Sequence, residues 1–132
     1  MASTGIVIVS HSAKLAEGLV DIVSEMNDGS VKIMAAGGAD EGRIGTNALK
    51  IMSAIESMED CNNILLYVDM GSSVISTEAA IDMIDEDLAE KVQVVDCPLV
   101  EGAFAGVVQA TITDDVDAII RVSKEAKEMP KC

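Results

Sequence analysis

The sequence predicts an α/β protein with an open, mainly parallel β-sheet and helices on both faces. Short aliphatic runs alternate along the chain with longer segments in which apolar residues recur at helical spacing. Two of these runs end directly in polar residues: residues 6–9 lead into His11, and residues 64–68 lead into Asp69. No Pro/Ser-rich linker or internal repeat divides the 132 residues, so we expect a single domain, residues 1–132.

The first unit is a strand followed by a helix. Residues 6–9 are all Ile or Val without polar alternation, which is typical of a strand covered on both faces. Ser12 is a suitable N-cap for the helix that follows. We expect that helix to bury the apolar residues that recur at helical spacing: Leu15, Leu19, Ile22, Val23 and Met26.

The second unit contains a glycine-rich loop. A turn at residues 27–30 precedes a second predicted strand, residues 31–36. Residues 37–46 hold four glycines and form a loop before the next helix begins. The apolar residues of that helix recur at helical spacing: Ala48, Ile51, Met52, Ile55 and Met58.

Two further units complete the predicted sheet, with strands at residues 64–68 and 91–96. We expect one helix between them, with these residues on one side: Val74, Thr77, Ile81, Ile84 and Leu88. Pro98 blocks helical continuation after the fourth strand, so a helix from about residue 100 to 110 follows. The last helix is predicted to be capped by Thr113 and to have an apolar side formed by Val116, Ile119, Ile120 and Ala126.

The composition argues against several functions. A formal charge of −14 repels polyanions and anionic membranes, and one Tyr, one Phe and no Trp offer few stacking surfaces for bases. We therefore expect no nucleic-acid and no membrane role. No apolar run approaches the length of a membrane span and no signal peptide is evident, so we expect a cytoplasmic protein. The three cysteines are widely spaced, which suggests neither a disulfide framework nor a zinc site.

His11, the only histidine, is the strongest catalytic candidate. It follows the first strand and precedes a helix, the place where open α/β sheets bind ligands. An imidazole can act as a base or nucleophile near neutral pH when its other ring nitrogen is held by a hydrogen bond. Asp69 is the best candidate to hold the ring and stabilise the charge that builds on it. The alternative is structural: His11 as a core or capping residue, and Asp69 as a helix N-cap.

Several residues are suited to surround a phosphoryl group. Backbone N–H groups at helix starts and in glycine turns bind anions, and hydroxyl groups add donors. Because parallel strands end at one edge of the sheet, we expect residues 10–12, 37–46, 69–73 and 97–102 to converge. Arg43 is a candidate to pair with phosphate oxygens or a partner's acid, or else is a solvated loop residue. The candidate site residues in these loops are Ser10, Ser12, Gly37, Gly38, Arg43, Thr46, Gly71, Ser72 and Ser73.

Residues 6–12, 37–46 and 69–73 together resemble the small phosphotransferase subunits (DhaM) of phosphoenolpyruvate-dependent dihydroxyacetone kinases, and residues 98–103 extend the match. That family is similar to the mannose-type (type-4) enzyme IIA domains of the sugar phosphotransferase system. The resemblance implies a parallel sheet with flavodoxin-like layering, a homodimer, and a histidine phosphorylated on a ring nitrogen.

The resemblance also implies a relay. Phospho-HPr, charged from phosphoenolpyruvate by enzyme I, would phosphorylate His11, which Asp69 supports. The ADP-binding kinase subunit (DhaL) would then take the phosphoryl group and regenerate ATP for phosphorylation of dihydroxyacetone on a third subunit (DhaK). This chain would bind no nucleotide, metal or other cofactor, and HPr and enzyme I would be separate proteins.

Two alternatives stay open at this stage. A mannose-type enzyme IIA component would pass its phosphate to an enzyme IIB during sugar uptake, although no Ala/Pro-rich tail leads to such a domain. A non-enzymatic ligand-binding or regulatory α/β module would use His11 only to cap a helix. The shortage of aromatic residues argues against a flavin in such a module.

Overall fold

A parallel β-sheet forms the middle layer of the protein. The structure, a computed structural model, describes residues 3–132. Its strands are β1 (Thr4–Ser10), β2 (Val31–Gly37), β3 (Asn63–Val68) and β4 (Val92–Val95). They form one sheet in the order β2-β1-β3-β4, and every pairing is parallel. The α/β fold predicted from the alternating pattern is therefore confirmed.

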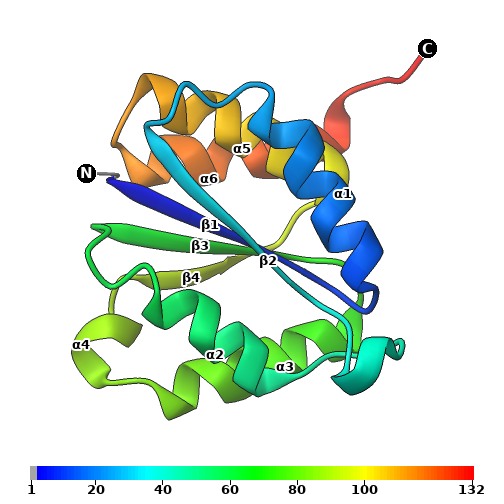
Figure 1. Ribbon diagram of the computed structural model, residues 1–132. Helices are drawn as coiled ribbons and strands as arrows, with labels where there is room; N and C mark the ends of the chain where they lie inside the picture. The colour runs from blue at the N-terminus through cyan, green and yellow to red at the C-terminus, as the bar shows by residue number, and fades with distance from the viewer. Residues whose placement is uncertain (1–2) are drawn as a thin grey trace.

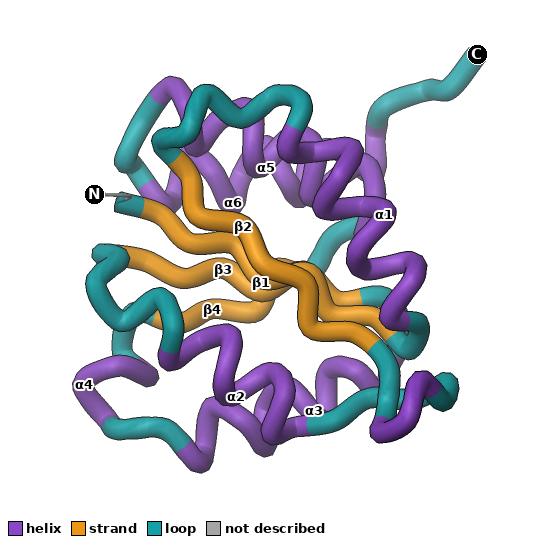
Figure 2. Tube along the Cα trace, viewed as in Figure 1, coloured by secondary structure: helices purple, strands orange, loops and turns teal. Residues whose placement is uncertain are grey.

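Helices cover both faces of this sheet (Figure 1). On one face lie α1 (Ala13–Ser24), α5 (Leu99–Ile112) and α6 (Val116–Glu125), and on the other α2 (Ala48–Glu56), α3 (Gly71–Met83) and α4 (Glu86–Ala89). Figure 2 shows the same layers, with loops that join the strands to the helices at both ends of the strands. In residues 3–132, none of the helices has both the length and the apolar character needed to cross a membrane.

β1 is the centre of the core because it contributes to both sides of the sheet. Its apolar side chains are fully buried and alternate between the two layers. Ile6 and Ile8 belong to the cluster under α1, α5 and α6, whereas Val7 and Val9 belong to the cluster over α2 and α3. This explains why residues 6–9 are a continuous apolar run without polar alternation.

The strand order creates a crevice at the end of β1. After β1 the chain passes through α1 to β2, which pairs with one side of β1. It then passes through α2 to β3, which pairs with the other side of β1. The connections that follow β1 and β3 therefore run over opposite faces, which defines a topological switch point between these strands. Val9 pairs with Val68 in the register, so the next residues beyond the strand ends, Ser10-His11 and Asp69, lie side by side.

The predicted buried stripe of α1 is only partly correct. Leu19 and Val23 are buried, but Leu15, Ile22 and Met26 are 45%, 54% and 47% exposed. Ala16, which the stripe omitted, is fully buried and completes the inward face. The periodicity overestimated the width of this face because α1 packs on the sheet on one side, and no element within residues 3–132 covers its outer side.

Two predicted helix boundaries are also wrong. The single helix expected after Asp69 breaks at Ile84, which has an extended backbone, and α4 then begins after Asp85. This break lets Ile84 and Leu88 both reach the core from separate segments. The last helix is capped by Asp115, not Thr113, because the Asp115 carboxylate accepts the N–H groups of Asp117 and Ala118.

Candidate functional site

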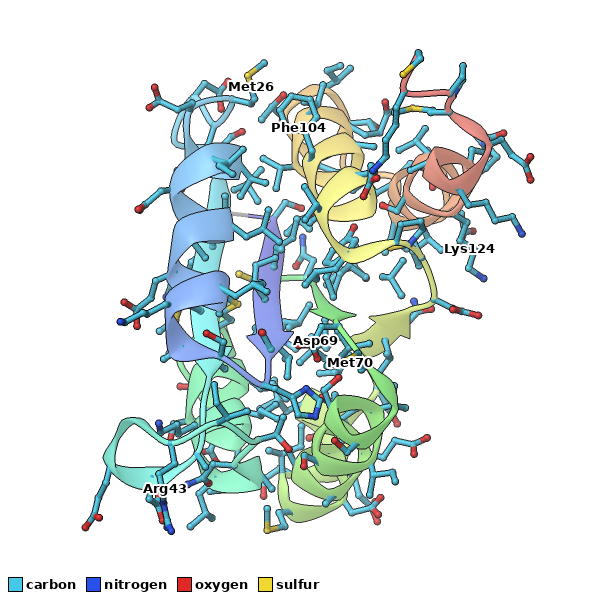
Figure 3. The ribbon with its side chains drawn as sticks, turned by 90° about the vertical axis from the view of Figure 1, so that its right-hand side faces the viewer. Met26, Arg43, Asp69, Met70, Phe104 and Lys124 are labelled. Atoms are coloured by element: carbon cyan, nitrogen blue, oxygen red, sulfur yellow. The ribbon has the colours of Figure 1, made fainter. Side chains whose placement is uncertain are left out.

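The carboxylate of Asp69 binds His11 at the edge of the sheet. Its Oδ1 accepts a hydrogen bond from Nδ1 of His11 at 2.9 Å and from the Met70 N–H at 2.7 Å. Its Oδ2 accepts from the Ser10 hydroxyl and from the His11 N–H, both at 2.9 Å. Asp69 and Met70 are labelled in Figure 3, between the end of β3 and the beginning of α3. Both oxygens of the carboxylate are therefore occupied by donors.

The Asp69 carboxylate is ionised at neutral pH. Burial raises the pKa of this carboxyl, but the hydrogen bonds from the His11 backbone and ring, from Met70 and from Ser10 outweigh burial and lower the pKa from 3.8 to about 2. An ionised carboxylate can only accept hydrogen bonds, so Nδ1 of His11 must carry the ring proton. The neutral ring then presents an unprotonated Nε2 with a free electron pair.

Nε2 of His11 faces the beginning of α3. It contacts the hydroxyl of Ser72, which donates to the unprotonated nitrogen. Gly71 and Ser72 are exposed, and a Cβ at Gly71 would meet no atom within 4 Å, so the space above this helix end is open. In the first turn of α3 the N–H of Ser73 donates to the Met70 carbonyl at 2.9 Å, whereas helix geometry gives the N–H groups of Gly71 and Ser72 no intrahelical acceptor. The helix dipole favours an anion at this position. The site thus places a nucleophilic nitrogen beside a region that favours an anion.

The glycine-rich loop holds the backbone of His11. The N–H of Gly45 donates to the His11 carbonyl at 2.8 Å, and the N–H of Gly38 donates to the Ser10 carbonyl at 3.1 Å. Both glycines have positive φ, +143° at Gly45 and +78° at Gly38, conformations that other residues rarely adopt. Gly37 lies so close to α1 that a Cβ would come within 2.7 Å of the Ser12 carbonyl oxygen. The role of Gly45 was missed because nothing in the sequence distinguishes it from the other loop glycines.

Three hydroxyl groups predicted for the site have structural partners. The Ser12 hydroxyl accepts the Leu15 N–H and caps α1, as the sequence predicts. Ser10 is fully buried, and its hydroxyl both donates to Asp69 and accepts the Ser12 N–H. Thr46 joins the glycine-rich loop to α3 through a 2.5 Å hydrogen bond with Ser76. These residues connect the loops that surround His11.

Some predicted residues do not meet at His11. Ser73 is fully buried, and its hydroxyl donates to the Met70 carbonyl, so it is turned away from solvent. Arg43 lies apart from Asp69 in Figure 3 and donates from Nε to the Asp40 carbonyl within its own loop. The turn at residues 97–102 packs Gly102 against Cys97 and α6. Within residues 3–132, no group of three or more His, Cys, Asp or Glu side chains is placed to hold a metal ion.

Comparison with known proteins identifies the family and supports the fold. Residues 5–120 match the EIIA-man family, described as the PTS system fructose IIA component. A crystal structure of a protein of unknown function superposes with a TM-score of 0.87 at 32% identity and covers 95% of both chains. The class of protein is therefore that of the enzyme IIA components of the phosphotransferase system.

Curated relatives identify a narrower group. The chain is 41% identical over 116 residues to "PEP-dependent dihydroxyacetone kinase 2, phosphoryl donor subunit DhaM" of Listeria innocua, covering 88% of this chain and 93% of that protein. It is 44% identical over 125 residues to the DhaM subunit of Providencia stuartii and 40% identical over 126 residues to that of Escherichia coli. These two matches cover 92% and 93% of this chain but 26% and 27% of the longer relatives. The chain belongs to the EIIA-man family, among the DhaM subunits of PEP-dependent dihydroxyacetone kinases.

Proposed function

We propose that this chain carries a phosphoryl group on Nε2 of His11. Phospho-HPr donates the group, and ADP bound on the partner kinase subunit DhaL accepts it, which regenerates ATP for the phosphorylation of dihydroxyacetone on DhaK. The observation that supports this most directly is the pairing of the ionised Asp69 with Nδ1, because it leaves Nε2 unprotonated and facing an anion-binding helix end. The names of the DhaM relatives support the same reaction class.

The first transfer forms one P–N bond and breaks another. The electron pair of Nε2 attacks phosphorus, and the nitrogen of the donor histidine leaves with the electron pair of its own P–N bond. Nδ1 keeps its proton throughout, and Asp69 stabilises the positive charge that the ring acquires. The phosphoryl oxygens accept hydrogen bonds from the first N–H groups of α3 and from the Ser72 hydroxyl.

The second transfer follows the same geometry in the opposite sense. A β-phosphate oxygen of ADP attacks phosphorus, the bond from Nε2 breaks, and Nε2 recovers its electron pair. No group on this chain needs to gain or lose a proton, because Nδ1 stays bound to Asp69 in both states. In this proposal the chain acts in the cytoplasm and binds no cofactor itself, since the nucleotide stays on the partner subunit.

We also propose that the protein is a homodimer that pairs through the outer face of α1 and α5. α5 is apolar on nearly all sides, and such a helix is normally covered all round. Yet four apolar side chains on these two helices and in the turn directly after α1 are between 37% and 54% exposed: Ile22, Met26, Val100 and Phe104. Met26 and Phe104 lie at the same end of this face in Figure 3. An apolar area of this kind is typical of a protein interface.

Intact mass spectrometry tests the relay. The purified chain is mixed with phosphoenolpyruvate, enzyme I and HPr, and we expect a gain of about 80 Da that is acid-labile and absent in His11→Ala. ADP-loaded DhaL should then remove the label and form ATP. A label that DhaL cannot remove would instead indicate transfer to an enzyme IIB, and no label at all would leave His11 with a capping role.

A further inference from the structure

Three strongly exposed apolar side chains lie on the segments that hold His11. Among residues 3–132, four large apolar side chains are more than 60% exposed: Ile44 (75%), Ile112 (71%), Ile75 (70%) and Met70 (62%). Ile112 lies at the opposite edge of the sheet, beside a hollow lined by Ser3 and Ser30. The other three lie at the edge that carries His11. Three of these four strongly exposed apolar side chains therefore lie at the edge of the sheet that carries His11.

Each of the three follows or precedes a group that holds His11. Met70 comes directly after Asp69, and its N–H shares Oδ1 of Asp69 with the imidazole. Ile44 directly precedes Gly45, whose N–H binds the His11 carbonyl. Ile75 is three residues after Ser72, so it stands one helical turn beyond the hydroxyl that contacts Nε2. A protein that brings its phosphoryl group to Nε2 therefore approaches beside the segments that carry these side chains.

We infer that Ile44, Met70 and Ile75 form a docking rim, which binds an apolar surface of the phosphoryl-donating protein. The inference rests on the proposed function and adds the surface that recognises the donor. Beyond Ile75, the exposed side of α3 continues with Glu78 and Asp82. On a chain of net charge −14, these carboxylates favour a donor whose apolar surface is bordered by Lys or Arg. Contact with the rim also excludes water from the transferring phosphoryl group.

A double variant, Ile44→Ser with Ile75→Ser, tests the rim. It leaves Met70 in place, and Ile112→Ser is the matched control at the opposite edge. Initial rates of labelling are measured against the concentration of phospho-HPr. In parallel, phosphoramidate, a small phosphoryl donor that needs no protein surface, labels His11 directly. We expect the double variant to raise the KM for phospho-HPr about 10-fold or more, with phosphoramidate labelling within about twofold of wild type.

The outcomes separate this inference from the proposed function. If the double variant and Ile112→Ser both have the same KM for phospho-HPr as wild type, the inference that the rim binds the donor protein is overturned. The proposed carrier function is then unaffected. If phosphoramidate labels wild type but phospho-HPr does not, the donor step of the proposed function fails and the rim fails with it.

Charge reversal gives a second test that leaves the apolar residues unchanged. Glu78→Lys with Asp82→Lys should raise the KM for phospho-HPr and weaken its dependence on salt, because both changes repel a basic border. An unchanged KM and an unchanged salt dependence would contradict the predicted charge of the donor surface.

Discussion

Replacing Asp69 by Asn tests the electrostatic basis of the site. The substitution keeps the size of the side chain but removes its charge and replaces one acceptor oxygen by a donor. Two of the four groups that donate to the carboxylate therefore lose their acceptor, whichever way the amide is turned. The Asp69 side chain is only 12% exposed, so water compensates little for this loss.

The pKa of Asp69 gives the magnitude. Its decrease from 3.8 to about 2 corresponds to about 2.4 kcal/mol of stability at neutral pH. Because the folded-state pKa is depressed, this contribution is complete above the unfolded-state value of 3.8 and is lost as the pH falls through about 2. At pH 3 about 1.4 kcal/mol remains. We expect Asp69→Asn to lower the free energy of unfolding by about 2 kcal/mol at pH 7, and by about half as much at pH 3.

Urea unfolding followed by circular dichroism measures both values. Asp96→Asn is the matched control, because Asp96 also follows a strand at this edge of the sheet but is exposed. We expect it to change the free energy of unfolding by less than about 0.5 kcal/mol at either pH. A difference between wild type and Asp69→Asn that does not shrink toward pH 3 would refute the assignment of this stability to the ionised carboxylate.

The single histidine allows a direct test of the ring. In long-range nitrogen NMR spectra of the wild type, only one side-chain imidazole gives signals. We expect its neutral form to carry the proton on Nδ1, and the Asp69→Asn variant to populate the other tautomer. A neutral ring protonated on Nε2 in the wild type would contradict the proposed nucleophile.

Four further substitutions, one of them with a matched control, have defined outcomes. His11→Ala should abolish acceptance of the phosphoryl group while the circular dichroism spectrum is retained, and Ser72→Ala should slow labelling by phospho-HPr about tenfold, since one hydrogen bond near Nε2 is lost. Gly37→Ala should lower the free energy of unfolding by about 1–3 kcal/mol in urea, because its Cβ would lie 2.7 Å from a carbonyl oxygen, whereas Gly18→Ala, with no atom within 4 Å, should not destabilise the protein. Phe104→Glu should shift sedimentation from dimer to monomer; a dimer that withstands this change would exclude the α1–α5 face as its interface.

Local sequence patterns predicted most of the fold. The β-branched run at residues 6–9 indicated a central strand, and Ser12 has the hydroxyl that caps α1. These features depend on residues within one turn or one strand, so the sequence contains the information directly. The predicted end of the helix after Asp69 was wrong because its break at Ile84 depends on how Ile84 and Leu88 pack in the core. The predicted cap of α6 was wrong because Thr113 and Asp115 are both residues that can cap a helix, and Asp115 makes the bonds.

The sequence by itself determined that a parallel sheet carries His11 at a strand end and that the glycine-rich and Asp69 loops end at the same edge. Only the tertiary structure decided which groups meet there. It paired Asp69 with Nδ1, used Gly45 to hold the His11 backbone, turned Ser73 inward and left Ile44, Met70 and Ile75 exposed. The physical reason is that these contacts join residues far apart in the chain. Their geometry follows from strand register and helix docking, which local periodicity does not encode.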